Sequence, residues 1–523
     1  MSTTHQGGTG KNIAILGGGI SGLSAAYHLL ELGHTCTVFE PMHQLGGNVR
    51  SKHLNIGGAD RWYEIGVNDF NANTYRNLVK IFDKLGVETK PLWDTAAYGN
   101  ILNEKNSATV AETGYTLSND NWGYGASQEI LDGDKRFHTE TARYLNIIDP
   151  NNLMSVGDFA EWARLNDTFV KQNLYPRIIG MFYTTGVPPA EMPMRMVLSY
   201  YLMQEGVGQG QSIGMHHGES LPDRRYFVGG ASQWIMKLVD HLQQSGCTLY
   251  THADAQFFVQ GNGQVCVQYA IKGGAQQTGY FDSIVLARQA KDIPSLFISP
   301  MPGGLEELLA RFKYSTNQVK IHSDSSLMLP NANAWRTYNI NIPTDLDYNN
   351  PDNLHYFISY FANQHQNDRQ NPDYNCQNKT FNDLCTEPAF FITVNDRDKV
   401  SDGCLLAPKP PYKTDDPLTS TGCPEMYTFY HNIFNFDAMQ AQDELQAMQG
   451  IGNIHYVGGY TKGAGLHEEC WLSGWAAAHK IDDPTFKDPN VWDFSKTGVD
   501  ALPQYMRELV TTHYQKRFRA FMS

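Results

Sequence analysis

The sequence predicts an α/β fold in which a domain with a parallel sheet is interleaved with a second, mixed α+β domain. Two observations lead to this prediction. An apolar run at 13–16 is followed by closely spaced glycines, by helical spacing of apolar residues at 24–32 and by a second apolar run at 35–39. This is the order of a strand, a helix and a parallel strand. In addition, 523 residues are too many for one simple core, so two domains are expected.

The glycines between the first strand and the helix form the pattern G-x-G-x-x-G at Gly17, Gly19 and Gly22. The first permits a tight turn, the second lets a pyrophosphate approach the backbone, and the third lets the helix lie close to the sheet. Backbone N–H groups at Ile20 and Ser21, where the helix starts, attract phosphates. Glycines also occur in ordinary turns, but the strand before and the helix after them predict a Rossmann-like dinucleotide-binding domain.

An acidic residue and a second glycine pair narrow the choice of nucleotide. Glu40 ends the second strand, 18 residues after Gly22, where a carboxylate accepts a hydrogen bond from a ribose and repels a 2′-phosphate. FAD or NAD is therefore favoured over NADP. Gly46 and Gly47 follow in QLGGNVRS, and a second tight turn there would let a long, extended cofactor such as FAD pass. The neighbouring positions expected at the cofactor are Pro41, Asn48 and Val49.

This arrangement resembles the flavin-containing amine oxidase superfamily, whose members carry a glycine doublet after the acid. The resemblance continues in the same order from residue 11 to residue 481, in blocks at 63–87, 225–238, 281–287, 319–329, 388–395, 429–445 and 454–481. It implies FAD as cofactor and the GR2-type flavin amine oxidase fold. Within the superfamily, the chain resembles a subgroup of predicted FAD-dependent oxidoreductases and desaturases associated with fatty acyl modification.

The resemblance also implies domains built from separate pieces of chain. Residues 1–90, 225–295 and 450–485 would form the FAD-binding domain, and residues 91–224 and 296–449 the substrate domain. Two segments rich in Asn, Asp, Pro and Tyr, 344–387 and 401–424, are expected to be long loops or insertions. Residues 486–523 form a C-terminal tail outside the family pattern.

The block at 454–481 gives the most specific expectations from the resemblance. In the superfamily this stretch ends a strand beside the flavin, which places Gly458 and Gly459 next to the ring. A helix starting near Glu468 would point its positive N-terminus at the ring. Ala255 would lie where the backbone meets the adenine, and Ala287, at the end of FDSIVLA, is also expected at the cofactor.

Candidate catalytic residues follow from the same alignment. His467 falls where amine oxidases of the superfamily commonly carry an aromatic side chain. It is therefore expected to contact the cofactor and the substrate or to transfer a proton. The alternative is a structural role. Lys320 lies near the position of a superfamily lysine that holds a water against flavin N5, and its role stays open. His322, Asp324 and Ser326 would share one face if this stretch is a strand.

That face would belong to the substrate cavity together with Trp335 and Tyr338, the alternative being a solvated strand face. Only one dinucleotide motif is present, so electrons are expected to leave the substrate as a hydride from a C–H bond to flavin N5 and to pass on to oxygen or an electron carrier. The expected substrate is a hydrophobic small molecule or acyl chain, with desaturation as the first choice. The alternatives are a double-bond isomerase, an amine oxidase and a non-catalytic escort-type scaffold.

Composition limits the partners and the location. The net charge of −14 without a block of like charges argues against nucleic acid, and the eight cysteines lack the spacing of a metal site. With no signal-peptide pattern and no apolar run near the roughly 18 residues of a membrane span, a cytoplasmic protein is expected. The basic, amphipathic segment 505–523 is expected to contact an anionic membrane surface or to be a docking or oligomer helix, and the oligomeric state stays open.

Overall fold

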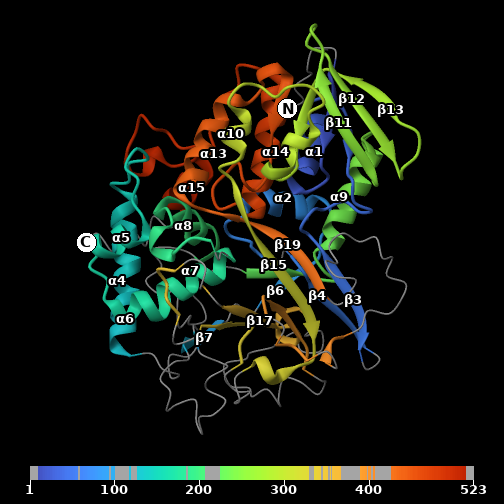
Figure 1. The fold of residues 1–523 in the computed structure, drawn as a ribbon. Coiled ribbons are helices and arrows are strands. Elements are labelled where there is room, and N and C mark those ends of the chain that lie inside the picture. Colours follow the sequence, from blue (N-terminus) through green and yellow to red (C-terminus); the bar gives the residue numbers. More distant parts are fainter. Residues whose placement is uncertain are drawn as a thin grey trace.

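A computed structural model of the chain describes residues 10–56, 59–66, 68–92, 96–99, 117–118, 127–183, 186–205, 224–328, 335–342, 346–350, 354, 356–366, 389–396, 399–401, 404–406 and 426–513. Two sheets dominate these residues. A five-stranded parallel sheet lies in the upper part of the molecule, and a seven-stranded sheet lies in the lower part (Figure 1).

The parallel sheet has the strand order β10-β2-β1-β14-β20. Its strands come from distant parts of the sequence and are β1 (Asn12–Leu16), β2 (Thr35–Phe39), β10 (Thr248–Tyr250), β14 (Ser283–Leu286) and β20 (Ile454–Tyr456). All four pairings in this sheet are parallel, with Ile13 of β1 opposite Cys36 on one side and Ser283 on the other. The two strands predicted at 13–16 and 35–39 are therefore neighbours in one sheet.

The side chains of β1 point alternately into two core clusters, one on each face of this sheet. Ile13 and Ile15 belong to a core cluster shared with the helices, whereas Ala14 and Leu16 belong to a second cluster, because successive side chains of a strand point to opposite faces. The helices that contribute to the first cluster include α1 (Ile20–Glu31), α2 (Arg76–Lys84), α9 (Ser232–Gln244) and α14 (His467–Asp482). The second cluster includes a three-stranded antiparallel sheet of β11 (Ala253–Val259), β12 (Val265–Ile271) and β13 (Gln277–Phe281).

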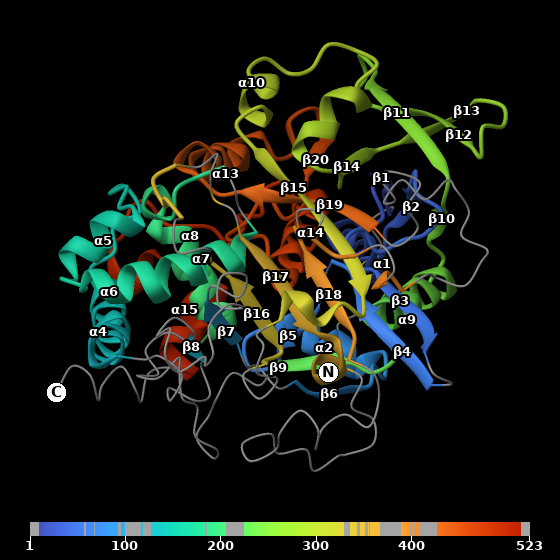
Figure 2. The ribbon, with the colours of Figure 1, turned by 60° about the horizontal axis from the view of Figure 1, so that its bottom comes forward.

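The seven-stranded sheet has the order β19-β15-β18-β17-β16-β7-β8. Its strands are β7 (Ala96–Gly99), β8 (Leu117–Ser118), β15 (Lys313–His322), β16 (Tyr338–Asn341), β17 (Phe357–Phe361), β18 (Phe391–Val394) and β19 (Met426–Ile433). The long strands β15 and β19 reach up toward the parallel sheet (Figure 2). A helical layer lies beside this sheet and contains α4 (Gln128–Leu145), α5 (Val156–Trp162), α6 (Asp167–Phe169), α7 (Tyr175–Phe182) and α8 (Met194–Tyr200).

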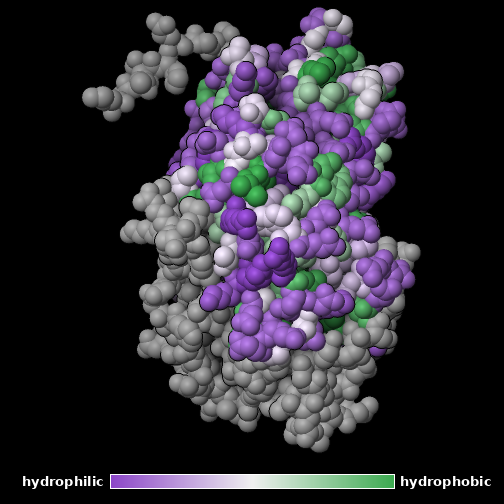
Figure 3. Space-filling view, turned by 90° about the vertical axis from the view of Figure 1, so that its left-hand side faces the viewer, coloured by the Kyte–Doolittle hydropathy of each residue, from purple (hydrophilic) through white to green (hydrophobic). Residues whose placement is uncertain are grey.

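Two smaller sheets complete the described strands. They are a hairpin of β3 (Ser51–Ile56) and β4 (Ala59–Glu64) and a three-stranded sheet of β5 (Phe70–Asn71), β9 (Arg224–Phe227) and β6 (Thr89–Pro91). The remaining α-helices of the described chain are α10 (Leu305–Leu309), α11 (Ala362–Gln366), α13 (Phe436–Met448) and α15 (Gln504–Glu508). The face formed by α4 and α5 is largely hydrophilic, with small separate apolar patches (Figure 3).

His322, Asp324 and Ser326 would share one face only if this stretch were a strand, and it is a strand only as far as His322. Strand β15 ends at His322, and a short 3-10 helix follows at Ser325–Leu327. The cause is Asp324, whose carboxylate accepts hydrogen bonds from the N–H of Ser326 at 2.9 Å and from the N–H of Ser401 at 3.0 Å. A side chain that binds the backbone two residues ahead favours a turn over a strand, so the shared face of the alternating polar residues does not form.

The C-terminal tail docks onto the protein as far as it is described. Tyr505 and Leu509 are buried in the main core cluster, and the Tyr505 hydroxyl donates to Oε1 of Glu469 at 2.6 Å. This arrangement agrees with the docking alternative for this part of the tail. Residues 514–523 and most of the expected insertions 344–387 and 401–424 lie outside the described residues. Among the helices that are described, none has the length and apolar character needed to span a membrane.

Candidate active site

The glycine turn brings α1 directly against the end of β1. Gly17 has a φ of +119°, and a Cβ atom there would lie 2.4 Å from the carbonyl oxygen of Ala287. A Cβ on Gly22 would lie 2.0 Å from the carbonyl oxygen of Gly17, so neither position accepts a side chain. Helix α1 starts after Gly19, which has no side chain to cap it, and its first turn has no acidic residue. Its N-terminal N–H groups and its dipole are therefore suited to an anion.

Glu40 closes this turn from the end of β2. Its buried carboxylate accepts hydrogen bonds from the N–H of Gly18 at 2.7 Å and from the N–H of Met42 at 2.9 Å. Each carboxylate oxygen has a further lone pair, and Glu40 lines the cavity described next. The second glycine pair is tied to the same turn, because the Gly46 N–H donates to the carbonyl of Gly18 at 2.7 Å.

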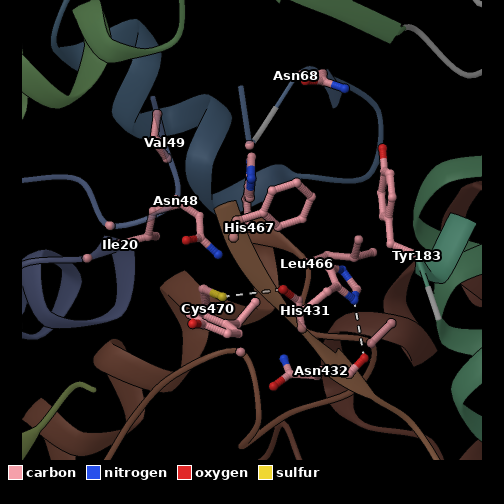
Figure 4. A pocket seen from close by; sticks show the side chains of 18 of the residues that line it. Ile20, Asn48, Val49, Asn68, Tyr183, His431, Asn432, Leu466, His467 and Cys470 are labelled. Carbon is pink, nitrogen blue, oxygen red and sulfur yellow. Dashed lines mark hydrogen bonds between the residues drawn. The ribbon is translucent and has the colours of Figure 1, made fainter. Parts of the chain in front are cut away.

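A cavity of about 700 Å³ extends from the glycine turn to the seven-stranded sheet (Figure 4). This volume lies within the range of about 300–1,000 Å³ that is usual for ligand sites. Most of the residues predicted at the cofactor line it, namely Gly19, Ile20, Ser21, Glu40, Pro41, Gly46, Gly47, Asn48, Val49, Ala287, Gly458, Gly459 and His467. Gly17 and Gly22 belong to the glycine turn but do not themselves line the cavity, and neither does Ala255 in β11.

Helix α14 starts at His467, within one residue of the predicted start, and its first turn meets the cavity at Leu466, His467 and Cys470. Glu468 does not line the cavity. Its carboxylate turns to the start of α2, where it accepts hydrogen bonds from the N–H groups of Asn77 at 2.9 Å and Leu78 at 3.0 Å. Burial raises the pKa of Glu468 to about 7 against these hydrogen bonds. Glu468 thus holds α14 against α2 and positions its neighbour.

His467 lies at the cavity as predicted, with its ring centroid 6.3 Å from that of Tyr75. Burial lowers the pKa of His467 to about 4, although the charge of Asp69 acts in the opposite direction. The imidazole is therefore neutral near pH 7. Because it is the first residue of α14, the positive end of that helix also disfavours its protonated form.

Beyond α14 the cavity becomes a chamber with aromatic walls. Its tyrosines are Tyr75, Tyr183, Tyr200, Tyr338 and Tyr360, and its apolar side chains include Met181, Phe182, Ile340, Ile358 and Phe429. Tyr338 lies there as predicted. Trp335 instead packs against Phe361 and Phe391, with ring centroids 5.5 Å apart in both cases.

A buried ion pair forms one side of this chamber. Oδ1 of Asp69 accepts from Nε of Arg224 at 2.9 Å, and its Oδ2 accepts from the Tyr338 hydroxyl at 2.5 Å. Burial acts to raise the pKa of Asp69, but the charge of Arg224, the neighbouring His365 and the hydrogen bond from Tyr338 hold it well below its usual range. The sequence analysis missed Asp69 and Arg224. The segments around them, Phe70–Asn71 and Arg224–Phe227, are short and mixed in polarity, so no local pattern indicated this pair.

Lys320 and His322 do not line the cavity, so their predicted placement there is wrong. Nζ of Lys320 forms an ion pair with Asp396 at 2.9 Å. Nε2 of His322 is 2.7 Å from Oγ1 of Thr393, and its Nδ1 accepts from the N–H of Asp324 at 3.1 Å. The reason is the position of β15 inside the sheet, where β18 pairs with this end of the strand and engages both side chains.

Comparison with known proteins gives relatives of one family. The model of a family described as flavin containing amine oxidoreductase matches residues 20–134. The chain is 27% identical over 327 residues to "Probable flavin-containing monoamine oxidase A" of Dictyostelium discoideum, a match that covers 60% of this chain and 63% of the relative. It is 37% identical over 81 residues to the 15-cis-phytoene desaturase of Synechococcus elongatus, a match that covers 16% of each chain. The matches thus span less than two thirds of these relatives.

The fold is also similar to that of a solved putrescine oxidase, with a TM-score of 0.56 and 14% sequence identity over 91% of this chain and 99% of the other. The cavity joins the glycine turn to a second chamber. Over residues 20–134 the chain resembles the flavin-containing amine oxidoreductase family, its fold is that of a flavin-dependent amine oxidase, and its cofactor is FAD. The predicted superfamily, fold class and cofactor are confirmed.

The residues present fit FAD. The uncapped start of α1 suits a pyrophosphate, Glu40 has lone pairs for a ribose, and the first turn of α14 lies at the same cavity. The described residues contain no cluster of His, Cys, Asp and Glu arranged for a metal ion.

Proposed function

We propose that this protein is an FAD-dependent oxidoreductase that removes a hydride from a C–H bond of a hydrophobic small molecule. One observation carries the proposal. A single cavity joins the dinucleotide turn at Gly19 and Glu40 to the aromatic chamber at Tyr338 and Tyr360. A substrate in the chamber and a dinucleotide on the turn would therefore lie in one continuous cavity.

FAD, when bound, would accept the hydride at N5 of its ring. The chain's own residues would bind and orient the reactants. The N–H groups at Ile20 and Ser21 would hold the pyrophosphate, and Glu40 would accept a hydrogen bond from the ribose. The N-terminus of α14 would stabilise negative charge on the reduced ring, because its dipole has its positive end there.

The chamber walls favour a hydrophobic substrate with one polar end. Apolar side chains and tyrosine rings make up much of the lining, and a hydrogen-bonded polar group is formed by Asp69, Arg224 and Tyr338. An unsaturated or acyl chain with desaturation as the reaction agrees with this lining, and one relative is named a phytoene desaturase. Oxygen or an electron carrier would reoxidise the cofactor.

An amine is the second candidate substrate. The cavity contains Asp69, whose carboxylate stays ionised because Arg224 and its hydrogen bonds keep its pKa low. An ionised carboxylate attracts an ammonium group. One relative is named a probable monoamine oxidase.

The test is the visible spectrum of the purified protein before and after anaerobic addition of a lipid extract and, separately, of a panel of amines. Bleaching of the flavin band by the lipid extract alone is the expected result, and bleaching by an amine alone would make amine oxidation the function. A yellow protein that neither addition bleaches would contradict hydride removal from these substrates. A protein that cannot take up FAD would contradict the enzyme assignment altogether.

A further inference from the structure

The histidine at position 431, which the sequence analysis did not single out, lines the chamber. We propose that His431 accepts the proton that the substrate loses together with its hydride. This inference rests on the proposed function and adds a catalytic residue to it.

The position of His431 follows from the pairing of β19. His431 lies opposite Ser315 of β15, near the end of the strand that reaches toward the parallel sheet. It lines the cavity together with Asn432 of the same strand and with Leu466 and His467 at the start of α14. Figure 4 shows the imidazole between Leu466 and Tyr183. His431 therefore lies where the cofactor end of the cavity meets the chamber.

A backbone contact assigns the tautomer of His431. Its Nδ1 lies 3.2 Å from the carbonyl oxygen of Asn432 (Figure 4). A carbonyl oxygen only accepts hydrogen bonds, so Nδ1 carries the hydrogen and donates it. In a neutral imidazole, Nε2 on the other side of the ring then has a lone pair available. This is the form that a proton acceptor requires.

The surroundings keep the ring neutral and in place. Burial lowers the pKa of His431 to about 4, while the contact with Asn432 acts in the opposite direction. The ring of Tyr183, at the end of α7, lies 5.6 Å away and its pKa is raised by burial. The hydroxyl of Ser315 donates to the carbonyl of Tyr183 at 2.9 Å and so joins β15 to the end of α7.

Other titratable groups approach the same part of the cavity. They include His467 from α14, Tyr314 from β15 and Tyr430 from β19 itself. The charged residues Arg288, Lys291 and Asp292, which follow β14, also line the cavity, and Lys291 lies over the ring of Tyr430. Burial raises the pKa of Tyr314 and lowers that of His467. His431 is the better acceptor of the two histidines, because His467 begins a helix whose positive end opposes an imidazolium. His431 lies in a strand and lacks this opposition.

The proposed step conserves atoms and electrons. The substrate C–H bond breaks with its electron pair leaving as hydride to FAD, and the neighbouring N–H, O–H or C–H bond gives its proton to Nε2 of His431. The electrons of that second bond form the new double bond. The substrate thus loses two hydrogen atoms, the cofactor gains one hydride, and the imidazolium later releases its proton to water when oxygen or a carrier reoxidises the cofactor.

The experiment compares His431→Gln with His322→Gln. His322 belongs to the same sheet and is also buried with a pKa lowered to about 4, but it lies outside the cavity. The first measurement is the rate of anaerobic flavin bleaching by whichever substrate class bleaches the wild-type chain. We expect His431→Gln to lower the rate roughly 10²- to 10⁴-fold, and His322→Gln to leave the rate unchanged in the fraction that folds.

Two further measurements distinguish a catalytic role of His431 from a purely structural one. The wild-type rate should fall below about pH 4–5 as Nε2 becomes protonated, and this acid limb should be absent in His431→Gln. Independently of activity, ¹⁵N NMR of histidine-labelled protein should show hydrogen on Nδ1 and not on Nε2 of His431, the signal being assigned by its loss in the variant.

The outcomes distinguish a wrong assignment of His431 from a wrong proposed function. If the wild-type chain bleaches with a substrate and His431→Gln bleaches as fast, the assignment of His431 is wrong while the proposed function stands. Hydrogen on Nε2 in the NMR spectrum overturns the assignment as well. If no substrate bleaches the wild-type chain although it holds FAD, the proposed function fails, and the role of His431 fails with it.

Discussion

At the scale of single residues, the Glu40 carboxylate holds the glycine turn through Gly18 and Met42 and has lone pairs left for a ribose. We predict that Glu40→Gln weakens FAD binding tenfold or more. A glutamine has one oxygen for these donors and no charge, and a hydrogen bond to a charged group contributes about 1.5–3 kcal/mol. The measurement is a fluorescence titration of the FAD-free protein.

A matched control for this variant is Asp282→Asn. The Asp282 carboxylate accepts from the N–H of Asn12 at 2.7 Å, at the end of β1 away from the glycine turn. It resembles Glu40 in binding the backbone of the parallel sheet, but it does not line the cavity. FAD affinity should be unchanged in the control. Equal affinities of the Glu40→Gln and wild-type chains would contradict the assigned role of Glu40.

Glu468 gives a prediction about pH. Burial raises the pKa of Glu468 in the folded state to about 7, above the ordinary value of 4.5. The folded protein therefore favours the protonated side chain, whose contribution to stability is fully present below pH 4.5 and is lost as the pH rises through 7. The free energy of unfolding of wild type minus that of Glu468→Gln should therefore rise by about 2 kcal/mol between roughly pH 7.5 and 5.5. Denaturant unfolding at both pH values measures it, and a difference independent of pH would contradict the raised pKa.

At the scale of elements, α1 and α14 pack closely because Gly474 has no side chain. A Cβ there would lie 2.3 Å from the carbonyl oxygen of Ser21, and the Ser24 hydroxyl donates to the carbonyl of Trp471 at 2.6 Å. Alanine ordinarily stabilises a helix relative to glycine by about 1 kcal/mol. Here we predict that Gly474→Ala destabilises the protein by about 1–3 kcal/mol, because the backbone must move.

The same variant should weaken FAD binding, since Ser21 lies in the turn of α1 that lines the cavity. Ala476→Gly, on the partly exposed side of α14, is the control. It should lose about 1 kcal/mol of stability without a change in FAD affinity. Thermal unfolding and FAD titration of both variants measure the two effects. An unchanged FAD affinity in Gly474→Ala would show that the α1–α14 contact does not position the turn.

Elements could be predicted from sequence where local chemistry decides them. The strand predicted at 35–39 coincides with β2, because apolar spacing acts over a few residues. The helix that the family resemblance implied near Glu468 begins at His467. The condition for a shared face of His322, Asp324 and Ser326 fails because the Asp324 carboxylate binds the backbone of Ser326 and of Ser401 and ends the strand. The contact with Ser401 spans 77 residues, which no local pattern reports.

At the scale of the whole molecule, the cavity is lined by both large sheets. Its walls include Glu40 after β2 and Ala287 after β14 on one side, and Ile358 of β17 and His431 of β19 on the other. We predict that FAD at 100 times its dissociation constant stabilises the protein by about 2.7 kcal/mol. It should also slow backbone hydrogen exchange in both sheets, as measured by mass spectrometry.

Adenosine diphosphate is the control for this prediction. It can occupy only the dinucleotide end of the cavity, so it should protect β1 and α1 and leave β17 and β19 unprotected. If FAD likewise protected the parallel sheet alone, the two ends of the cavity would not be joined by the bound cofactor, and the proposed enclosure would be wrong.

The spacing of Gly17, Gly19 and Gly22 and the position of Glu40 predict the α/β fold and a turn for FAD or NAD, because a strand, a turn and a helix in series need no distant partner. The second glycine pair and the resemblance to the flavin-containing amine oxidase superfamily then favour FAD. The chamber, in contrast, depends on tertiary structure. Asp69 and Arg224 are 155 residues apart, and strand pairing turns Lys320 and His322 toward β18 while β19 brings His431 to the cavity. Which side chains meet there is set by the pairing of distant strands, and that register is a property of the folded sheet.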